Sequence, residues 1–181
     1  DASSYEFTPQ ELKSQIERFD LKTHHSISIT GGEPLLWANF LEDFLPLLEN
    51  KIYLETNATI NNGLKHIIDY VHIISADIKL SSATGVENSF SSHDEFFKIA
   101  TQYAKEIFAK IVFDENILDD EINNCIKLAE KYNLPLILQP KMINNQLTMD
   151  NDKMFQIFNK FLAKRPNTRL IPQVHKFLGI L

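Results

Sequence analysis

The sequence is poor in cysteine, in arginine and in long apolar runs, and each shortage argues against a class of protein. Cys125 is the one cysteine among 181 residues, so the chain forms no internal disulfide and fits a reducing compartment. No apolar run approaches the ~20 residues that cross a bilayer, which predicts a cytoplasmic protein without a membrane partner. The arginines (Arg18, Arg165 and Arg169) are few for a surface that binds polyanions.

The charge balance is acidic, with 18 Lys and Arg against 24 Asp and Glu and a formal net charge of −6. Affinity for nucleic acid comes largely from neutralising phosphates, so this balance argues against a nucleic-acid partner. Hydrophobic residues make up 44% and charged residues 23%, which are ordinary globular values. No linker or repeat divides the chain, and we expect a single domain over residues 1–181.

Short β-branched runs alternate with longer amphipathic runs, which is typical of an α/β protein. Several strand-like runs are apolar on both faces, as in a parallel sheet that helices cover. Polar chemistry is then expected where the strands end. The predicted strands are Ser26–Thr30, Ile52–Thr56, His72–Leu80, Ala109–Phe113, Leu134–Gln139 and Arg169–His175.

Three local signals mark helix ends. Thr8-Pro9-Gln10-Glu11 predicts a capping box with proline in the first turn of a helix. Ser92-His93-Asp94-Glu95 predicts a second capping box. Pro46 predicts that the helix before it kinks or ends near Phe44.

The first predicted strand ends in Thr30-Gly31-Gly32-Glu33-Pro34. Two adjacent glycines let a ligand approach the backbone closely, because no Cβ stands in the way. A carboxylate at this place can accept charge-assisted hydrogen bonds from an ammonium group. An ordinary strand-to-helix turn also collects glycine and proline, but the tetrad directly after a strand is a strong signal for a binding site.

This run, Ser28–Leu36, resembles the glycine-rich motif of radical S-adenosylmethionine enzymes, which binds the amino group of the cofactor's methionine part. The other strand ends are similar to one branch, the 7-carboxy-7-deazaguanine synthases of queuosine biosynthesis. Ala58, Asp77 and Ile78 stand where that branch has Gly, Ser and Pro. The matching segments are Leu54–Thr59, Ser75–Lys79, Leu138–Pro140 and Leu170–Lys176.

The resemblance implies a partial (β/α)6 barrel with parallel strands and outer helices, in which the first strand and the cluster loop are missing. It implies no catalytic side chain, because the radical is generated on the cofactor, and no metal-ligating residue. The implied contacts are Gly31, Gly32, Glu33, Ala58, Asp77, Lys79 and Gln139 for the cofactor and Thr56, Gln173 and His175 for the substrate.

The implied reaction converts 6-carboxy-5,6,7,8-tetrahydropterin to 7-carboxy-7-deazaguanine, with S-adenosylmethionine, a 4Fe–4S cluster and an external electron donor. The family holds its cluster with three thiolates, and Cys125 alone cannot do so. We interpret Asp1 as following the third cysteine, so that the chain by itself is inactive. Magnesium ion is a further implied cofactor, with Ala2 where the family often has a hydroxyl and Ser3 as the nearby substitute.

Structural roles are open for several of these residues. Thr56 can cap a turn, Asp77 and Lys79 can form a surface pair, and Gln139 and His175 can serve the fold alone. Two other functions also stay open. A glycyl-radical-activating enzyme shares the Gly-Gly-Glu-Pro and Asp-x-Lys patterns, and a paralogue without the cluster would only bind a nucleoside-like ligand.

The missing first strand would leave Ser26–Thr30 with an unpaired edge. Unguarded edges of apolar strands pair with other chains, and no proline stands in this segment. We therefore expect either a homodimer through this strand or a cover formed by Ser3–Phe7.

Overall fold

A computed structural model describes residues 6–104 and 106–178, with the side chains of His175 and Phe177 outside the description. Its centre is a six-stranded sheet in the order β1-β2-β3-β4-β5-β8, in which every neighbouring pair is parallel. The strands are β1 Ile27–Ile29, β2 Ile52–Thr56, β3 Ile73–Lys79, β4 Glu106–Phe113, β5 Leu136–Pro140 and β8 Arg169–Leu170. The predicted α/β class is confirmed.

Helices connect these strands. The α-helices are α1 Pro9–Ile16, α2 Ala38–Phe44, α3 Asn61–Ile67, α4 Ser81–Thr84, α5 Phe90–Tyr103, α6 Asp119–Tyr132, α7 Asn151–Leu162 and α8 Val174–Phe177. The 3₁₀ helices are η1 Leu21–Thr23, η2 Pro34–Trp37, η3 Leu45–Leu47 and η4 Ile68–Tyr70. A small antiparallel hairpin of β6 (Met142–Ile143) and β7 (Gln146–Leu147) follows β5.

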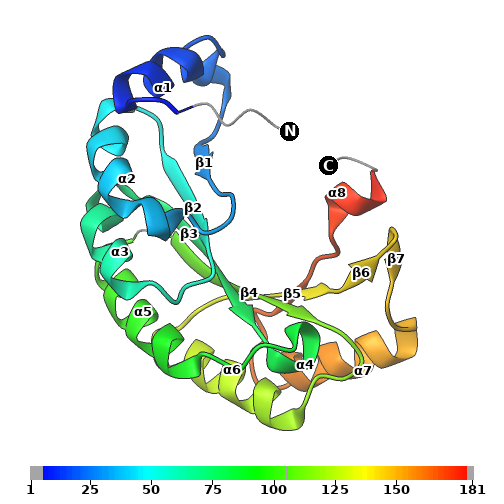
Figure 1. Ribbon diagram of the computed structural model, residues 1–181. Helices are drawn as coiled ribbons and strands as arrows, with labels where there is room; N and C mark the ends of the chain where they lie inside the picture. The colour runs from blue at the N-terminus through cyan, green and yellow to red at the C-terminus, as the bar shows by residue number, and fades with distance from the viewer. Residues whose placement is uncertain (1–5, 105, 179–181) are drawn as a thin grey trace.

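The sheet is curved, and the longer helices lie along its outer, convex side (Figure 1). β1 and the C-terminal segment with α8 lie on opposite sides of the opening, so the sheet does not close into a complete barrel (Figure 1). The architecture is therefore a partial barrel with outer helices, as the sequence predicts.

The two faces of the sheet differ in chemistry. Side chains that face the helices are apolar and fully buried, for example Leu54, Ile74 and Ile111, and they form the core. Side chains alternate between the faces of a strand, so Glu55 and Lys110 lie on the concave face. Burying the convex face supplies the main stabilisation of the fold, whereas the concave face is free to carry polar groups.

Two of the predicted helix ends are confirmed. At the start of α1, the Glu11 N–H donates to Thr8 Oγ1 at 3.3 Å, and the Glu11 carboxylate accepts from the Thr8 N–H at 2.8 Å. α2 ends at Phe44, two residues before Pro46. The local rules for caps and prolines therefore hold at these two positions.

The capping box predicted at Ser92 is wrong. α5 begins at Phe90 with Ser89 as its N-cap, and the His93 N–H already donates to the Ser89 carbonyl at 3.0 Å. Phe90 packs against the core. The apolar contact of Phe90 therefore extends the helix beyond the capping signal.

The last predicted strand is shorter than the sequence suggests. β8 covers Arg169–Leu170, and α8 replaces the rest of the predicted strand from Val174 onward. Pro172 has no N–H to donate to a ladder, which limits strand pairing beyond this point.

β1 forms one edge of the sheet and pairs with β2 alone among the described residues. The alternative cover by Ser3–Phe7 falls mainly on residues outside the description. Beside this edge, an apolar hollow of about 680 Å³ has Ile29, Trp37 and Phe40 in its lining. Pairing of a second chain along β1 stays a prediction.

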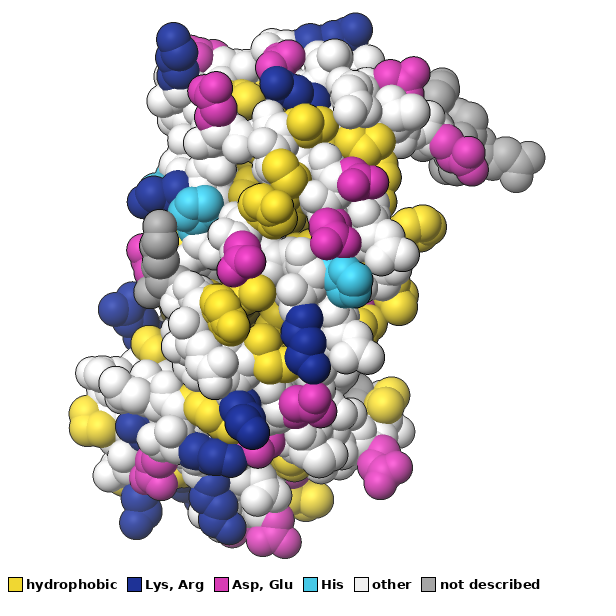
Figure 2. Space-filling model, turned by 90° about the vertical axis from the view of Figure 1, so that its left-hand side faces the viewer, with side chains coloured by type: hydrophobic (Ala, Val, Ile, Leu, Met, Phe, Trp, Pro, Cys, Tyr) yellow, Lys and Arg dark blue, Asp and Glu magenta, His cyan; other side chains and the backbone are white. Residues whose placement is uncertain are grey.

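The helix-covered side of the molecule is an ordinary charged surface. Lys and Arg side chains alternate there with Asp and Glu side chains, and small apolar areas lie between them (Figure 2). Within residues 6–104 and 106–178, no helix has the length and apolar character that crossing a bilayer requires.

Gly63 lets α3 lie directly against the turn that follows the glycine pair. A Cβ at Gly63 would stand 2.4 Å from the backbone oxygen of Leu35 in η2. We predict that Gly63→Ala lowers the free energy of unfolding by about 1–3 kcal/mol, as overpacking does, although alanine is the better helix former. Urea denaturation measures this, with Asn62→Ala in the same helix as an exposed control. Equal or greater stability of Gly63→Ala would contradict the close contact.

Candidate functional site

The glycine pair forms an open turn after β1. Gly31 has a φ of +132°, a conformation that L side chains rarely adopt, and both Gly31 and Gly32 are exposed. A Cβ at either position would have no atom within 4 Å. The backbone of this turn is therefore within reach of a ligand, as the sequence predicts.

Glu33 ties this turn to the end of β2. Its carboxylate accepts hydrogen bonds from the Leu35 N–H at 3.1 Å, the Thr56 hydroxyl at 2.7 Å and the Asn57 N–H at 2.8 Å. Glu33 is 9% exposed. A carboxylate offers about four acceptor positions, so three serve the fold and one remains for a ligand.

Thr56 and Ala58 continue the same chain of hydrogen bonds. The Thr56 hydroxyl donates to Glu33 and accepts from the Ala58 N–H at 3.1 Å. The Ala58 carbonyl accepts from His93 Nδ1 at 3.1 Å, so Nδ1 carries the proton. Burial lowers the pKa of His93, which keeps the imidazole neutral. The Thr56 hydroxyl, the Ala58 N–H and the Ala58 carbonyl therefore all form hydrogen bonds to other groups of the protein.

Lys79, at the carboxyl end of β3, lines a hollow of about 210 Å³ beside these groups. The residues around the hollow are Asn57, Thr59, Lys79, Thr84, Val86, Glu87, Ser89 and His93. Lys79 Nζ forms no hydrogen bond or ion pair with the residues that the structure describes. The carboxyl ends of β2 and β3 thus present a polar hollow with an available cation.

Asp77 does not pair with Lys79 at hydrogen-bond distance. It forms an ion pair with Lys110 on β4, whose Nζ lies 3.0 Å from Asp77 Oδ1 and also donates to the Glu55 carboxylate. Burial raises the pKa of Asp77 more than Lys110 lowers it. Burial acts to lower the pKa of Lys110, but the two carboxylates outweigh it and the pKa is raised. Lys110 therefore stays charged on the concave face.

The other predicted contacts come from the last strands. Gln139 is half-buried in β5, and its strand neighbour is Val112. Gln173 precedes α8, and its Oε1 is buried without a hydrogen-bond partner among the described residues. His175 belongs to α8, but its side chain lies outside the description. The contact roles of these three residues remain predictions.

Sequence reasoning missed Lys110, Ser75 and Glu121. Lys110 had a signal, because a charge interrupts the apolar run Ala109–Phe113. Ser75 belongs to the segment Ser75–Lys79 that resembles the synthases, but the resemblance implies no contact for it. It is 1% exposed, and its hydroxyl has no hydrogen-bond partner among the described residues. Glu121 follows two other acidic residues at the start of α6, so its sequence context gives no sign of burial, yet it is 2% exposed.

Glu121 holds the loop that follows β3. Its carboxylate accepts from the Ser81 hydroxyl at 2.9 Å, the Ser82 N–H at 3.1 Å, the Asn88 amide at 3.3 Å and the Leu118 N–H at 3.0 Å. Burial acts to raise the pKa of Glu121, but these hydrogen bonds outweigh it and lower the pKa to about 2. One carboxylate thereby fixes part of the rim next to Lys79.

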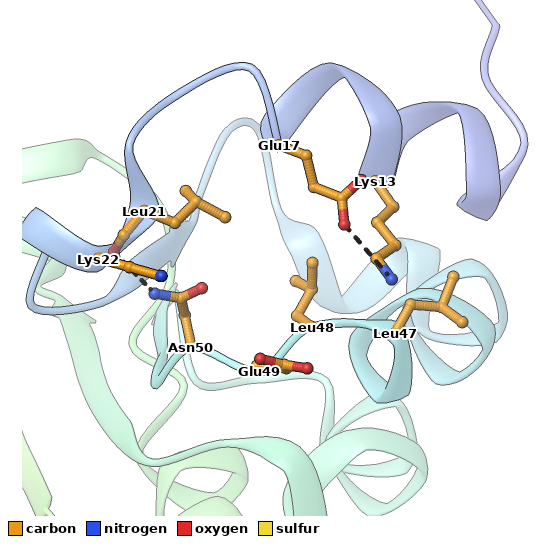
Figure 3. A pocket seen from close by; sticks show the side chains of 8 residues that line it. All are labelled: Lys13, Glu17, Leu21, Lys22, Leu47, Leu48, Glu49 and Asn50. Carbon is orange, nitrogen blue, oxygen red and sulfur yellow. Dashed lines mark hydrogen bonds and ion pairs between the residues drawn. The ribbon is translucent and has the colours of Figure 1, made fainter.

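A hollow at the other end of the sheet is separate from these groups. It has a volume of about 360 Å³ and lies before β1 and β2, between α1 and η3 (Figure 3). Lys13 and Glu17 form an ion pair at 3.5 Å on one side, and the Asn50 amide donates to the Leu21 carbonyl at 3.1 Å on the other. It therefore lies away from the carboxyl ends of the strands.

The Thr56–Glu33 hydrogen bond yields a stability prediction. Thr56→Val should lower the free energy of unfolding by about 1.5–3 kcal/mol, because hydrogen bonds to charged groups contribute that much. Thr56→Ser keeps the hydroxyl and is the matched control. Urea denaturation at pH 7 measures both variants. A valine variant as stable as the serine variant would show that the bond does not hold the two strand ends together.

Glu121 predicts a pH dependence. Its pKa is about 2 in the folded protein against 4.5 ordinarily, so its stabilisation is present above pH 4.5 and is lost as the pH falls toward 2. Glu121→Gln should be less stable than the parent at pH 7 and should lose less stability over that acid range. Acid denaturation followed by circular dichroism tests this, with Glu130→Gln on the exposed side of α6 as control. Parallel acid profiles for parent and Glu121→Gln would contradict it.

Comparison with curated proteins finds a consistent set of relatives. The chain is 37% identical over 163 residues to the 7-carboxy-7-deazaguanine synthase of Geobacter sulfurreducens, covering 87% of this chain and 64% of that protein. It is 29% identical over 171 residues to the synthase of Archaeoglobus fulgidus, covering 90% of this chain and 70% of that one. The chain thus spans slightly less than two thirds of the Geobacter protein. No family model matches the sequence.

Solved structures support the fold. Streptococcus suis SuiB bound to S-adenosylmethionine superposes with a TM-score of 0.63 at 11% identity, covering 96% of this chain and 45% of that one. SuiB bound to the precursor peptide SuiA gives a TM-score of 0.66 at 11% identity, covering 93% and 43%. These similarities establish the fold. The chain is similar in sequence to the 7-carboxy-7-deazaguanine synthases over most of its own length.

Proposed function

We propose that this chain supplies the ligand-binding half-barrel of an enzyme that converts 6-carboxy-5,6,7,8-tetrahydropterin to 7-carboxy-7-deazaguanine in queuosine biosynthesis. The observation that carries the proposal is the open Gly31–Glu33 turn, held against the end of β2 in a chain similar to the synthases. The reaction contracts a ring and releases ammonia. The protein's share is to bind, orient and shield the reactants.

S-adenosylmethionine fits the residues at the carboxyl ends of the strands. The accessible backbone of Gly31 and Gly32 and the free acceptor position of Glu33 suit the ammonium group of its methionine part. Lys79, whose Nζ has no hydrogen bond or ion pair within residues 6–104 and 106–178, offers a cation for the cofactor's carboxylate, and Gln139 is a further polar contact. When bound and reduced, S-adenosylmethionine supplies the radical that removes hydrogen from the substrate.

Two of the contacts implied by the resemblance already bond to other groups of the protein. Ala58 uses its N–H and one acceptor position of its carbonyl inside the protein, so a contact with the cofactor would use the second acceptor position or the methyl group. Asp77 lies on the concave face by the alternation of side chains along β3, and there it forms an ion pair with Lys110. We propose that these residues contribute through the groups beside them.

An iron–sulfur cluster does not fit the residues of this chain. Cys125 is its one thiol, and that thiol is fully buried in α6 among core residues. Burial and the Glu121 charge raise the pKa of Cys125, which opposes the thiolate that a cluster needs. The described residues contain no group of three His, Cys, Asp or Glu side chains arranged for a metal ion. No step of the reaction is therefore assigned to a cluster held by these residues.

The substrate contacts follow the last strand and β2. Gln173 has a buried Oε1 without a hydrogen-bond partner among the described residues, and a ligand N–H is expected to bind there. His175 follows in the next helix. Thr56 acts indirectly, because its hydroxyl orients Glu33. Together they would hold the pterin at the open mouth of the half-barrel.

Other parts of the proposal rest on the sequence alone. They are an external electron donor, a homodimer paired along β1, a cytoplasmic location and a magnesium ion. The residues considered for magnesium, Ala2 and Ser3, lie outside the described residues. The similarity to the synthases does not favour a glycyl-radical-activating enzyme or a nucleoside-binding paralogue without catalysis.

An anaerobic assay tests the function. A protein in which three cysteines precede Asp1, with a reconstituted cluster, reductant and S-adenosylmethionine, should convert 6-carboxy-5,6,7,8-tetrahydropterin to 7-carboxy-7-deazaguanine, identified by mass spectrometry. The 181-residue chain alone should form no product, because its single cysteine cannot hold the cluster. A cluster-loaded protein that cleaves S-adenosylmethionine but leaves the tetrahydropterin unchanged would contradict the proposed substrate.

A further inference from the structure

Four polar side chains meet on the concave face of the sheet, away from the glycine turn. Glu55 on β2 pairs in register with Ser75 on β3, and Asp77 on β3 pairs with Lys110 on β4. Residues two apart on a strand share a face, so all four lie on the same side of the sheet. We call Glu55, Ser75, Asp77 and Lys110 the interior polar cluster.

Lys110 is the centre of this cluster. Its Nζ donates to Glu55 and lies 3.0 Å from Asp77 Oδ1, and its side chain is 16% exposed. The Glu55 side chain is 35% exposed, so it remains accessible from the opening. With two carboxylates and one ammonium, the cluster carries a net charge of −1.

Ser75 is the group that the fold does not explain. It is 1% exposed, and its Oγ has no hydrogen-bond partner among the described residues. Leaving a buried hydroxyl unpaired costs about 1–3 kcal/mol, and apolar residues often stabilise an interior better than charged groups do. An alanine at this place would serve the fold at least as well, so the hydroxyl indicates a ligand.

The charge of the cluster selects the ligand. The Lys110 ammonium group already interacts with the carboxylates of Glu55 and Asp77. The cluster therefore disfavours binding of an anionic ligand group. Glu55 keeps a carboxylate oxygen that no hydrogen bond occupies in the described part of the chain. Such an acceptor matches adjacent N–H groups, as on the amino-pyrimidine edge of a pterin.

We propose that the interior polar cluster binds the amino-pyrimidine edge of the substrate, with Glu55 accepting its N–H groups and Ser75 completing the contact. Lys110 is a positioning residue, because it holds the Glu55 carboxylate in place and does not touch the ligand. The inference rests on the proposed function, since it says that the barrel interior binds the amino-pyrimidine edge of that substrate. It places the carboxyl-bearing end of the pterin toward the opening of the half-barrel.

The test compares two neutral probes that differ at one group. Pterin has the 2-amino group, whereas lumazine has an oxygen there. Calorimetric titration of the chain should show pterin binding at least ~10-fold more tightly than lumazine, because losing one hydrogen bond to a charged acceptor costs about 1.5–3 kcal/mol. Glu55→Gln should bring this preference close to unity. Glu106→Gln, an exposed carboxylate on β4, is the control and should keep it.

Ser75→Ala separates binding from folding. Removing an unpaired buried hydroxyl should leave the melting temperature unchanged or higher, while pterin binding weakens by roughly 3–10-fold. A lower melting temperature with unchanged pterin affinity would assign Ser75 to the fold and overturn the inference. Unchanged selectivity in Glu55→Gln would overturn it as well, and the proposed function would stand. A parent protein that binds neither probe would contradict the pterin substrate class, and with it both proposals.

Discussion

The Glu33 carboxylate is the interaction on which the candidate site depends. It stands at the end of β1 and gathers the Leu35 N–H, the Thr56 hydroxyl and the Asn57 N–H. These are charge-assisted bonds in a largely buried place, where they are stronger than bonds between neutral groups. Through Thr56 and Ala58 the same series of hydrogen bonds reaches His93 on α5. Loops that are far apart in the sequence therefore behave as one rigid rim.

The two faces of the sheet have different roles: the convex face stabilises the fold, and the concave face carries polar groups. Its convex face is apolar and packs against helices, and this packing keeps the strands together. Its concave face carries the paired Glu55 and Lys110 and the unpaired Ser75 hydroxyl. Buried polar groups of this kind contribute little to folding, which is why we propose that they bind a ligand. A half-barrel can tolerate them because the curved sheet is already stabilised from its outer side.

Local patterns predicted much of this structure. Ile52–Thr56 has the bounds of β2 as predicted, since the apolar residues Ile52 and Leu54 alternate there with Tyr53 and Glu55. The turn at Gly31 lies where the sequence places it, because glycine is required at its positive φ. The hairpin of β6 and β7 was missed, because its strands have two residues each and are too short to show periodicity.

Most of the contacts that could not be predicted from the sequence join residues that are far apart along the chain. Nothing near Lys110 in the sequence says that Glu55 and Asp77 come beside it, since strand order and register decide this. The same holds for Glu121, whose partners Ser81 and Ser82 lie about 40 positions away. A charge inside an apolar strand shows that a partner exists, but only the sheet identifies that partner.

The burial of Cys125 has a practical consequence for spectroscopy. It is the single thiol of the chain, it is fully buried, and its raised pKa keeps it protonated at neutral pH. Thiol reagents attack thiolates at accessible sites, so the native protein should be almost inert to maleimides. A cysteine introduced on the exposed surface can therefore carry a fluorophore or spin label without prior removal of Cys125. Two such cysteines, one on each side of the opening, would make distances across the half-barrel measurable with Cys125 still in place.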